Sequence, residues 1–303
     1  MTTVPDDDPA AVFADHRPVL YGLAYRLLGS ASDAEEVLQE AFVRWYDADR
    51  ASITTPAAWL TTIVTRLGLD QLRTVRRRRE VYPGTWLPEP VLTGDLGPLE
   101  TAEQRDSVSL GVLTLLEGLS PPERAVFVLH EAFAFRHRDV ADVLDVDEPT
   151  CRQWLHRARR HLDGGRPRFG VDPAQHRRLV DRFMAATLDG DVDGLARLLA
   201  DDVVSWADGG GDGAARRPVR GRERVLRYLG GLGSHPGAAG VVLTAAEVNA
   251  EPAALVWQGS RLLAVVALES DGHHITTVRF LAAPAKVARL ARRLDSVPSV
   301  PEV

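Results

Sequence analysis

Residues 147–162 read Asp-Glu-Pro-Thr-Cys-Arg-Gln-Trp-Leu-His-Arg-Ala-Arg-Arg-His-Leu and predict a basic amphipathic helix. Asp147 can accept hydrogen bonds from backbone N–H groups of the first turn, and Pro149 lacks an N–H that this turn leaves unpaired anyway. The apolar positions recur at steps of three and four residues, which places them on one stripe: Cys151, Leu155, Ala158 and Leu162. The stripe is expected to be buried, and the arginines fill the other faces.

A second short helix is expected immediately upstream, over residues 138–144, with a tight connection at Asp145 and Val146. Two short helices, a tight turn and a basic second helix form the layout of a helix-turn-helix, in which the second helix lies in the DNA major groove. The residues expected to approach DNA are Arg152, Gln153, Trp154, His156 and Arg157. The alternative is a surface helix that is merely rich in arginine.

Composition places the chain among globular proteins of about two domains, with 303 residues, 45% of them hydrophobic and 26% charged. The net charge of -6 argues against DNA binding if it is spread evenly, but arginines concentrate in residues 66–79 and 149–168. Local basic patches set phosphate affinity more than whole-chain charge does. The sequence has no apolar run of membrane-spanning length, an acidic N-terminus unlike a signal peptide, and a single cysteine, so a cytoplasmic protein is expected.

Three helices are expected in the first part of the chain. Residues 9–28 carry one apolar face and end at a glycine, and a second helix is expected to begin at Ser32, where Glu35 completes a capping box. Pro56 opens the third helix, because proline suits the first turn. That helix runs into four consecutive arginines, residues 76–79, which cover every helical face and therefore favour phosphate contacts over packing. The alternative is a solvated helix end whose cations suit the helix dipole.

Prolines and glycines interrupt the helical pattern over residues 81–105, which are expected to form a linker. Its apolar part is Trp86-Leu87-Pro88-Glu89-Pro90, and a tryptophan in a linker usually docks on another surface. Helices are expected to resume from Asp106, and Ser120 with Glu123 predicts a further capping box.

The second half of the chain changes to an α+β pattern. Helices are expected over residues 173–188, 192–200, 222–229 and 284–294. Strands are expected over residues 203–206, 241–248, 253–257, 262–268 and 275–281, in a meandering antiparallel sheet. A glycine-rich loop, residues 208–213, follows the first strand. Its glycines permit positive φ and close backbone approach, which suits either a bare loop or a docking surface.

Several of these stretches together resemble bacterial sigma factors of the extracytoplasmic-function group, a branch of the sigma-70 family. Residues 33–42 resemble the helix that binds RNA polymerase, and residues 58–73 resemble the helix that reads the minus-ten promoter element. Residues 119–127 and 155–159 resemble the domain that reads the minus-thirty-five element. The motifs occur in the group's order and spacing, over essentially the whole chain.

The linker motif at residues 86–90 and the loop at residues 208–211 resemble the sigma factor J type, in which a SnoaL-like domain is fused to the C-terminus. The implied fold is multi-domain: two all-α sigma domains, namely the region 2 helical bundle and the region 4 helix-turn-helix, followed by a SnoaL-like, NTF2-like α+β cone. The implied boundaries are 9–80 for region 2, 81–105 for the linker, 106–165 for region 4 and 172–294 for the cone.

The resemblance implies a non-enzymatic initiation factor, without cofactor or metal, that directs bacterial core RNA polymerase to promoter DNA and is regulated in cis by its C-terminal domain. The polymerase-binding residues would be Asp33, Glu36, Gln39, Glu40 and Arg44, an acidic outer face suited to a basic partner. The minus-ten residues would be Trp59, Arg66, Arg73, Arg76 and Arg77, since arginine pairs phosphates and stacks on bases. The regulatory contact would use Trp86, Pro88, Asp208, Gly209, Gly210 and Gly211.

The sequence departs from the group's pattern at a few positions. Arg66 stands where asparagine is frequent. Asp145 stands in the helix-turn-helix turn where glycine is usual, although aspartate tolerates the left-handed region better than most residues. Asp212 replaces the lysine that usually follows the glycine loop, and residues 283–287, Ala-Pro-Ala-Lys-Val, replace Asn-Pro-Asp-Lys-Leu.

Two other functions are open on the residues alone. A ligand-responsive helix-turn-helix regulator would bind a small molecule in the C-terminal domain, but it would not need residues 9–80. An enzyme would need a carboxylate or histidine inside the cone as general acid-base, for which the candidates are Asp202, Asp208, His273 and His274. The two histidines are expected to alternate along a strand, so that at most one points into the cone.

Overall fold

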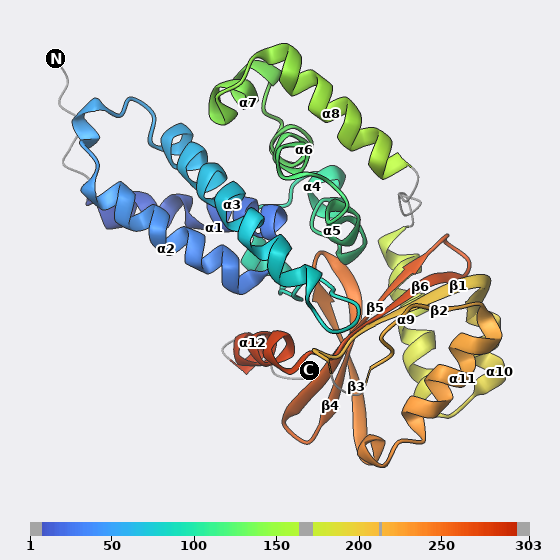
Figure 1. Ribbon diagram of the computed structural model, residues 1–303. Helices are drawn as coiled ribbons and strands as arrows, with labels where there is room; N and C mark the ends of the chain where they lie inside the picture. Colours follow the sequence, from blue (N-terminus) through green and yellow to red (C-terminus); the bar gives the residue numbers. More distant parts are fainter. Residues whose placement is uncertain (1–7, 164–171, 212–213, 296–303) are drawn as a thin grey trace. The chain divides into compact units, whose positions relative to one another are not determined.

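The computed structural model describes residues 8–163, 172–211 and 214–295 (Figure 1). Contacts divide the chain into two units. The first contains residues 1–80, 94–108 and 112–165, and the second contains residues 81–93, 109–111 and 166–303. Residues 81–93 therefore fold with the C-terminal unit, although they directly follow the third helix of the N-terminal one.

The first unit begins with a bundle of three helices: α1 (Pro9–Leu28), α2 (Ala31–Asp47) and α3 (Pro56–Glu80). Asp8 caps α1 by accepting from the Ala10 N–H at 3.0 Å, and Gly29 ends it with a φ of 65°. Ser30 caps α2 by accepting from the Asp33 N–H at 3.2 Å, so the predicted cap at Ser32, with Glu35 closing a capping box, is wrong by two residues. Ser30 lies directly after the turn and offers the same hydroxyl cap as Ser32.

The rest of this unit consists of short helices: α4 (Ala102–Asp106), α5 (Leu110–Leu116), α6 (Pro121–Phe127), α7 (His137–Leu144) and α8 (Glu148–Asp163). A 3₁₀ turn, Thr93–Leu96, precedes α4, and a π-helical turn, Val128–Ala132, extends α6. Glu123 accepts from the Ser120 N–H at 3.0 Å, which confirms the predicted capping box. Helix resumes earlier than the predicted Asp106, because Thr101 and Gln104 form a further capping box.

The second unit is built on a six-stranded sheet with the order β2-β1-β6-β5-β4-β3. Its strands are β1 (Leu199–Asp208), β2 (Val219–Arg220), β3 (Val241–Val248), β4 (Glu251–Gln258), β5 (Arg261–Ser270) and β6 (Ile275–Leu281). Strands β3 to β6 form the predicted antiparallel meander. The sheet is nevertheless mixed, because β1 pairs in parallel with β6. The two-residue β2 is too short to give a pattern in the sequence.

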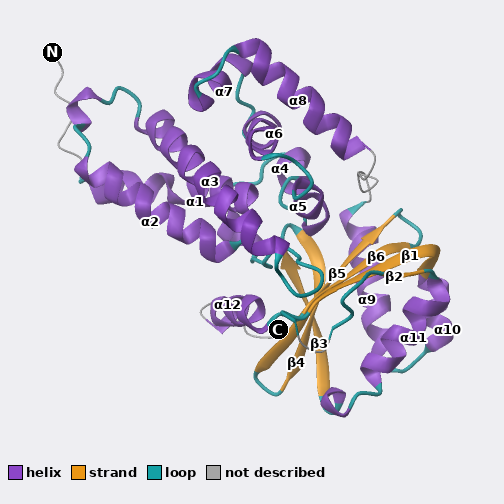
Figure 2. Ribbon diagram, in the orientation of Figure 1, coloured by secondary structure: helices purple, strands orange, loops and turns teal. Residues whose placement is uncertain are grey.

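Helices cover the two faces of this sheet (Figure 2). On one face α9 (Pro173–Leu188), α10 (Val192–Leu198) and α11 (Arg222–Gly233) pack with the sheet around an apolar core that includes Phe183, Val225 and Val278. On the other face α12 (Pro284–Asp295) and the segment around Leu87 pack on the sheet. In the part of the chain that is described, no helix combines the length and apolar character needed to cross a membrane.

Candidate functional site

Helices α7 and α8 form the predicted helix-turn-helix. Asp145 ends α7 in the left-handed region, with φ 57° and ψ 52°, so aspartate does take the conformation that glycine would favour. Asp147 then accepts from the Thr150 N–H at 2.8 Å, as the sequence predicts for the start of α8. The predicted inner stripe is buried: Cys151, Leu155, Ala158 and Leu162 are each at most 3% exposed. The turn and the core of the motif follow directly from its residues.

The residues predicted to approach DNA lie on the opposite side of α8. Exposed side chains here are Arg152, Gln153, His156 and Arg157. Trp154 is half-buried, so it lies at the border between the core and this face. Arg152 pairs with Glu148 one turn earlier at 2.5 Å, a surface ion pair that costs little to exchange for a phosphate or base.

A groove lies beside the start of α3. Its volume is about 540 Å³, and it is lined by Ser52, Ile53, Thr54, Thr55, Ala58, Trp59, Thr62, Ile63 and Arg66. Trp59 is one wall, and its ring lies 5.6 Å from that of Trp45. Two predicted minus-ten residues, Trp59 and Arg66, therefore share one concave surface. The loop residues 52–55 were missed in the sequence, because short polar loops carry no periodic signal.

Two of the predicted minus-ten arginines on α3 bond to carbonyl groups in the later part of the same unit. Arg66 Nε donates to the Val143 carbonyl at 3.2 Å, and Arg76 Nη1 donates to the Leu119 carbonyl at 3.0 Å. Arg73 is exposed and pairs with Asp70 at 2.9 Å, and Arg77 is exposed. The five predicted minus-ten residues are therefore not all free on one surface in this structure.

The arginine block of residues 76–79 also corrects a prediction. We expected the four arginines to favour phosphate contacts over packing, but Arg79 is largely buried and donates to Glu117 and to the Leu28 carbonyl. Helical spacing places Arg76 and Arg79 on one side, three residues apart, and leaves Arg77 and Arg78 exposed. Half of the block therefore packs, and the other half stays available to solvent or phosphate.

Glu117 is the centre of a partly buried cluster in this unit. Arg124 Nη1 donates to Glu117 at 2.5 Å, while Arg124 Nε donates to the Arg26 carbonyl at 3.1 Å. Burial lowers the pKa of Arg79 to about 10. Burial alone would raise the pKa of Glu117, but the charges of Arg124 and Arg79 and their hydrogen bonds outweigh it, so this pKa is lowered. The cluster joins α1, α3 and the α5–α6 connection, and Glu117 is held ionised.

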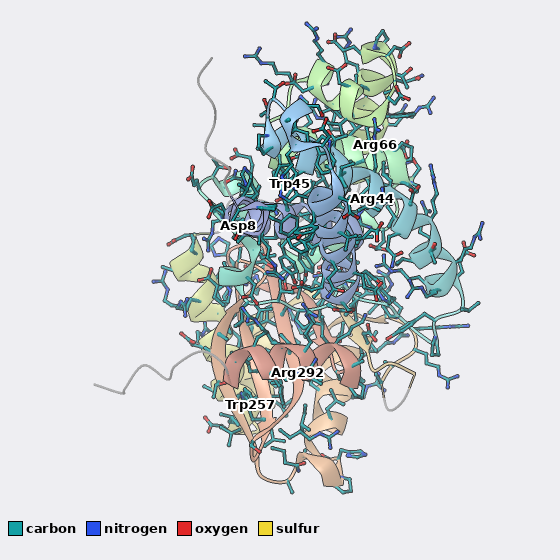
Figure 3. All side chains as sticks on the ribbon, turned by 90° about the vertical axis from the view of Figure 1, so that its left-hand side faces the viewer. Asp8, Arg44, Trp45, Arg66, Trp257 and Arg292 are labelled. Atoms are coloured by element: carbon teal, nitrogen blue, oxygen red, sulfur yellow. The ribbon has the colours of Figure 1, made fainter. Side chains whose placement is uncertain are left out.

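The outer face of α2 carries four of the five residues predicted to bind polymerase. Glu36, Gln39, Glu40 and Arg44 are exposed, and Arg44 pairs with Glu40 at 2.9 Å. Figure 3 labels Arg44 on α2 and Arg66 on α3. The placement of Asp33 on this face is wrong: Asp33 is 9% exposed, accepts from Gln71 Nε2 at 3.3 Å and faces Arg78 at 3.7 Å. Asp33 lies in the first turn, where α2 meets α3.

Two apolar side chains on α2 were missed in the sequence. Val43 is 53% exposed and Tyr46 is 61% exposed, and both lie within a turn of Arg44. The hydrophobic pattern assigns other residues to the inner face of α2, which leaves this valine and this tyrosine among the charged residues outside. Apolar residues that are left outside in this way are the sequence signal that could have marked an interaction surface. Together they give α2 a mixed polar and apolar outer surface, which is typical of a protein interface.

Asp208 fixes residues 81–93 to the rest of the second unit, an arrangement called here the clamp. This side chain is 1% exposed, and its carboxylate accepts four hydrogen bonds. The Tyr82 hydroxyl donates to Oδ1 at 2.6 Å and the Gly210 N–H at 3.1 Å, while the Leu87 N–H donates to Oδ2 at 2.9 Å and Lys286 Nζ at 2.7 Å. Burial and the bond to Asp208 raise the pKa of Tyr82.

Lys286 completes this clamp from α12. Its Nζ also donates to the Leu87 carbonyl, and it lies 4.3 Å from the centre of the Trp86 ring. Leu87 is fully buried and Pro88 is buried. Trp86 of the linker therefore docks as predicted, and its partner is Lys286, the lysine of the altered motif at residues 283–287. The sequence did not single out Lys286 as a functional residue.

The glycine loop after β1 packs against the same segment. Gly211 has a φ of 106°, and a Cβ atom built on it would lie 2.8 Å from Pro83 Cγ. Gly210 has a φ of 70° and approaches Ala283. Gly209 is half-buried, and Asp212 lies outside the described residues. Further along, Val91 N–H donates to Asn249 Oδ1 at 3.1 Å, so the contact continues past the clamp.

Family models match three parts of the chain: Sigma-70 region 2 at residues 12–79, Sigma-70 region 4 at residues 109–162, and a SnoaL-like domain at residues 180–282. The probable ECF RNA polymerase sigma factor SigI of Mycobacterium tuberculosis is 34% identical over 292 residues, which cover 95% of this chain and 98% of the relative. The chain belongs to the ECF RNA polymerase sigma factors. It lines up with its relatives across the helical and the α+β halves alike.

A second relative is similar to this chain both in sequence and in its solved structure. The ECF sigma factor SigJ of M. tuberculosis is 43% identical over 220 residues, which cover 71% of this chain and 70% of the relative. The crystal structure of M. tuberculosis SigJ matches with a TM-score of 0.73 and 35% identity, and covers 92% of this chain and 98% of that one. The predicted family and the predicted multi-domain fold, with its C-terminal SnoaL-like domain, are confirmed.

Family membership decides between an initiation factor and a ligand-responsive regulator. The N-terminal bundle, which a ligand-responsive regulator would not need, matches sigma region 2. The catalytic candidates do not converge: Asp202 is exposed, Asp208 is committed to the clamp, and the two histidines lie in a turn after β5. The prediction that these histidines alternate along a strand is wrong, because Asp271 accepts from both of their N–H groups and closes that turn.

Proposed function

We propose that this sigma factor binds core RNA polymerase through the outer face of α2. The support is the mixture of exposed groups there, in which Val43 and Tyr46 lie among Glu36, Glu40 and Arg44. Exposed apolar side chains bordered by charges suit a protein partner, and acidic groups suit a basic one. Asp33 would instead support this face from beneath, since it ties α2 to α3 through Gln71.

We propose two DNA-reading surfaces. The exposed face of α8 would lie in the major groove at the minus-thirty-five element, where arginine and glutamine can pair base edges and phosphates. The groove around Trp59, with residues 52–55 as its rim, would receive the unpaired minus-ten strand, because an aromatic wall and a nearby guanidinium suit an exposed base. Arg66 and Arg76 would exchange their carbonyl acceptors for DNA, so promoter binding by them requires region 4 to move from α3.

We propose that the C-terminal domain regulates the factor in cis by holding the segment after α3. The domain boundary would lie close to residue 81, since residues 81–93 bond to Asp208, Lys286 and Asn249. The conformation of the connection between regions 2 and 4 would then depend on whether that clamp is closed. A small-molecule ligand for the cone stays a prediction, as does a cytoplasmic location.

The polymerase face can be tested with a matched pair of substitutions. Val43→Glu places a charge at the centre of the proposed face, and Val192→Glu makes the same change at a helix position of similar exposure, 53% against 57%. We expect Val43→Glu to weaken binding to core polymerase at least tenfold, because it replaces an apolar contact with a carboxylate that must lose its water in the interface, and Val192→Glu to leave it unchanged. Equal binding by both variants in a fluorescence titration would contradict the assignment.

A further inference from the structure

Arginines gather at one edge of the C-terminal sheet. The sequence from residue 216 to residue 227 contains six arginines and a single acidic residue, Glu223. This segment is the loop before β2, β2 itself and the first half of α11. Strand β2 is the last strand of the sheet on that side, so the arginines lie at an edge of the domain.

One of the six arginines has a structural task. Arg222 Nε donates to the Leu199 carbonyl at 2.9 Å, and its Nη1 pairs with Asp201 at 2.8 Å, which fixes the start of α11 to β1. The other five are exposed: Arg216, Arg217, Arg220, Arg224 and Arg227. Within the described ranges, none of these five guanidinium groups has an ion-pair partner.

The other helices of the domain carry fewer arginines than this segment. Helix α9 has Arg177, Arg178 and Arg182 beside Asp181, and Arg197 of α10 pairs with Asp191 at 3.7 Å. The chain as a whole has a net charge of -6. An uncompensated group of arginines in an acidic chain repels itself, so it is best explained by a polyanionic partner.

We propose that this edge, called here the β2–α11 basic edge and comprising Arg216, Arg217, Arg220, Arg224 and Arg227, contacts the phosphate backbone of promoter DNA. Arg224 and Arg227 are three residues apart on the solvent side of α11, while Val225 on its opposite side is buried. A guanidinium pairs two phosphate oxygens at once, and the contact reads no sequence. The SnoaL-like domain thus adds a DNA contact to those of regions 2 and 4.

The test uses the full chain and duplex DNA, measured by fluorescence anisotropy at several salt concentrations. The variant carries Arg220→Gln, Arg224→Gln and Arg227→Gln. The matched control carries Arg177→Gln, Arg178→Gln and Arg182→Gln, which removes the same charge from exposed positions of α9. Both variants should melt like the parent chain, because none of the six side chains is buried.

Log affinity falls as log salt concentration rises, and we expect this dependence to be less steep in the β2–α11 variant, by about 2–3. The estimate takes about 0.9 for each phosphate that the protein no longer neutralises. Affinity near 0.1 M salt should fall at least tenfold, on a promoter duplex and on an unrelated duplex alike, and the control should change neither. If the β2–α11 variant keeps the salt slope and DNA affinity of the parent, the proposal is overturned, even if its binding to core polymerase is weaker. A separate α8 variant, Arg152→Gln with Arg157→Gln, tests DNA binding by region 4. A failure of the region 4 proposal can therefore be told apart from a failure of the β2–α11 proposal.

Discussion

The buried pair of Asp208 and Lys286 allows a quantitative prediction about the clamp. Asp208→Ala removes the acceptor of four hydrogen bonds and leaves a lysine that is 7% exposed without its carboxylate. Lys286→Met keeps the length and apolar contacts of the side chain beside Trp86 but leaves Asp208 without its counter-ion. Removing one partner of a buried ion pair typically costs about 3–5 kcal/mol, because the remaining charge stays out of water.

The two substitutions should not be additive. Once Asp208 is alanine, the lysine has no carboxylate to lose, so the double variant is spared part of the second penalty. We expect each single variant to lose about 3–5 kcal/mol and the double variant to lose about 2–3 kcal/mol less than their sum. At about 2–4 °C for each kcal/mol in a unit of this size, the singles should melt roughly 6–20 °C lower.

The assay is urea unfolding of the four chains, followed by far-ultraviolet circular dichroism and tryptophan fluorescence. The control is Asp201→Ala, which breaks an ion pair with Arg222 in which the aspartate side chain is 91% exposed, and should cost no more than about 1 kcal/mol. Losses from Asp208→Ala and Lys286→Met that add within about 0.5 kcal/mol would refute the reasoning, since uncoupled residues do not form a clamp.

Three further predictions concern the rest of the molecule. Glu117→Gln should lower the free energy of unfolding at neutral pH. Because the pKa of Glu117 is lowered from 4.5 in the folded protein, the stability that its charge contributes should be complete above about pH 4.5 and be lost as the pH falls through the lowered pKa. Unfolding curves of the parent and the variant should therefore converge in acid. Arg152→Ala should cost about 1–3 kcal/mol of promoter affinity; a loss confined to one base position shows pairing with a guanine, and an equal loss on all duplexes shows a phosphate contact. Gly211→Ala should lower the melting temperature, because φ is 106° and its Cβ would meet Pro83, whereas Gly230→Ala in α11 has open space and should raise it; a melting temperature unchanged by Gly211→Ala would count against close packing of the loop.

Local sequence signals predicted most of the helical half. The Asp147 cap, the left-handed Asp145 and the buried stripe of α8 all follow from chemistry within a few residues. The misses came where a nearby residue offered the same chemistry or where the residues in contact are distant in the chain. Ser30 replaced Ser32 as a cap, and Asp33 is buried because α3, far along the chain, lies against it.

The linker clamp shows where sequence reasoning stops. The residues of the linker motif and the glycine loop could be singled out, but Tyr82, Asn249 and Lys286 could not, because their partners lie between 78 and 199 residues away in the chain. A lysine within Ala-Pro-Ala-Lys-Val carries no local sign of burial. The pairing of β1 with β6 was missed for the same reason, since parallel pairing leaves no pattern in either strand alone.

The most direct measurement is run-off transcription with bacterial core polymerase on the promoter upstream of this protein's own gene. The full-length chain should yield transcripts from one defined start site, and Val43→Glu should abolish them while Val192→Glu does not. Asp208→Ala should change their yield if the clamp regulates the connection between regions 2 and 4. A full-length chain that neither binds core polymerase nor yields a specific transcript would contradict the account.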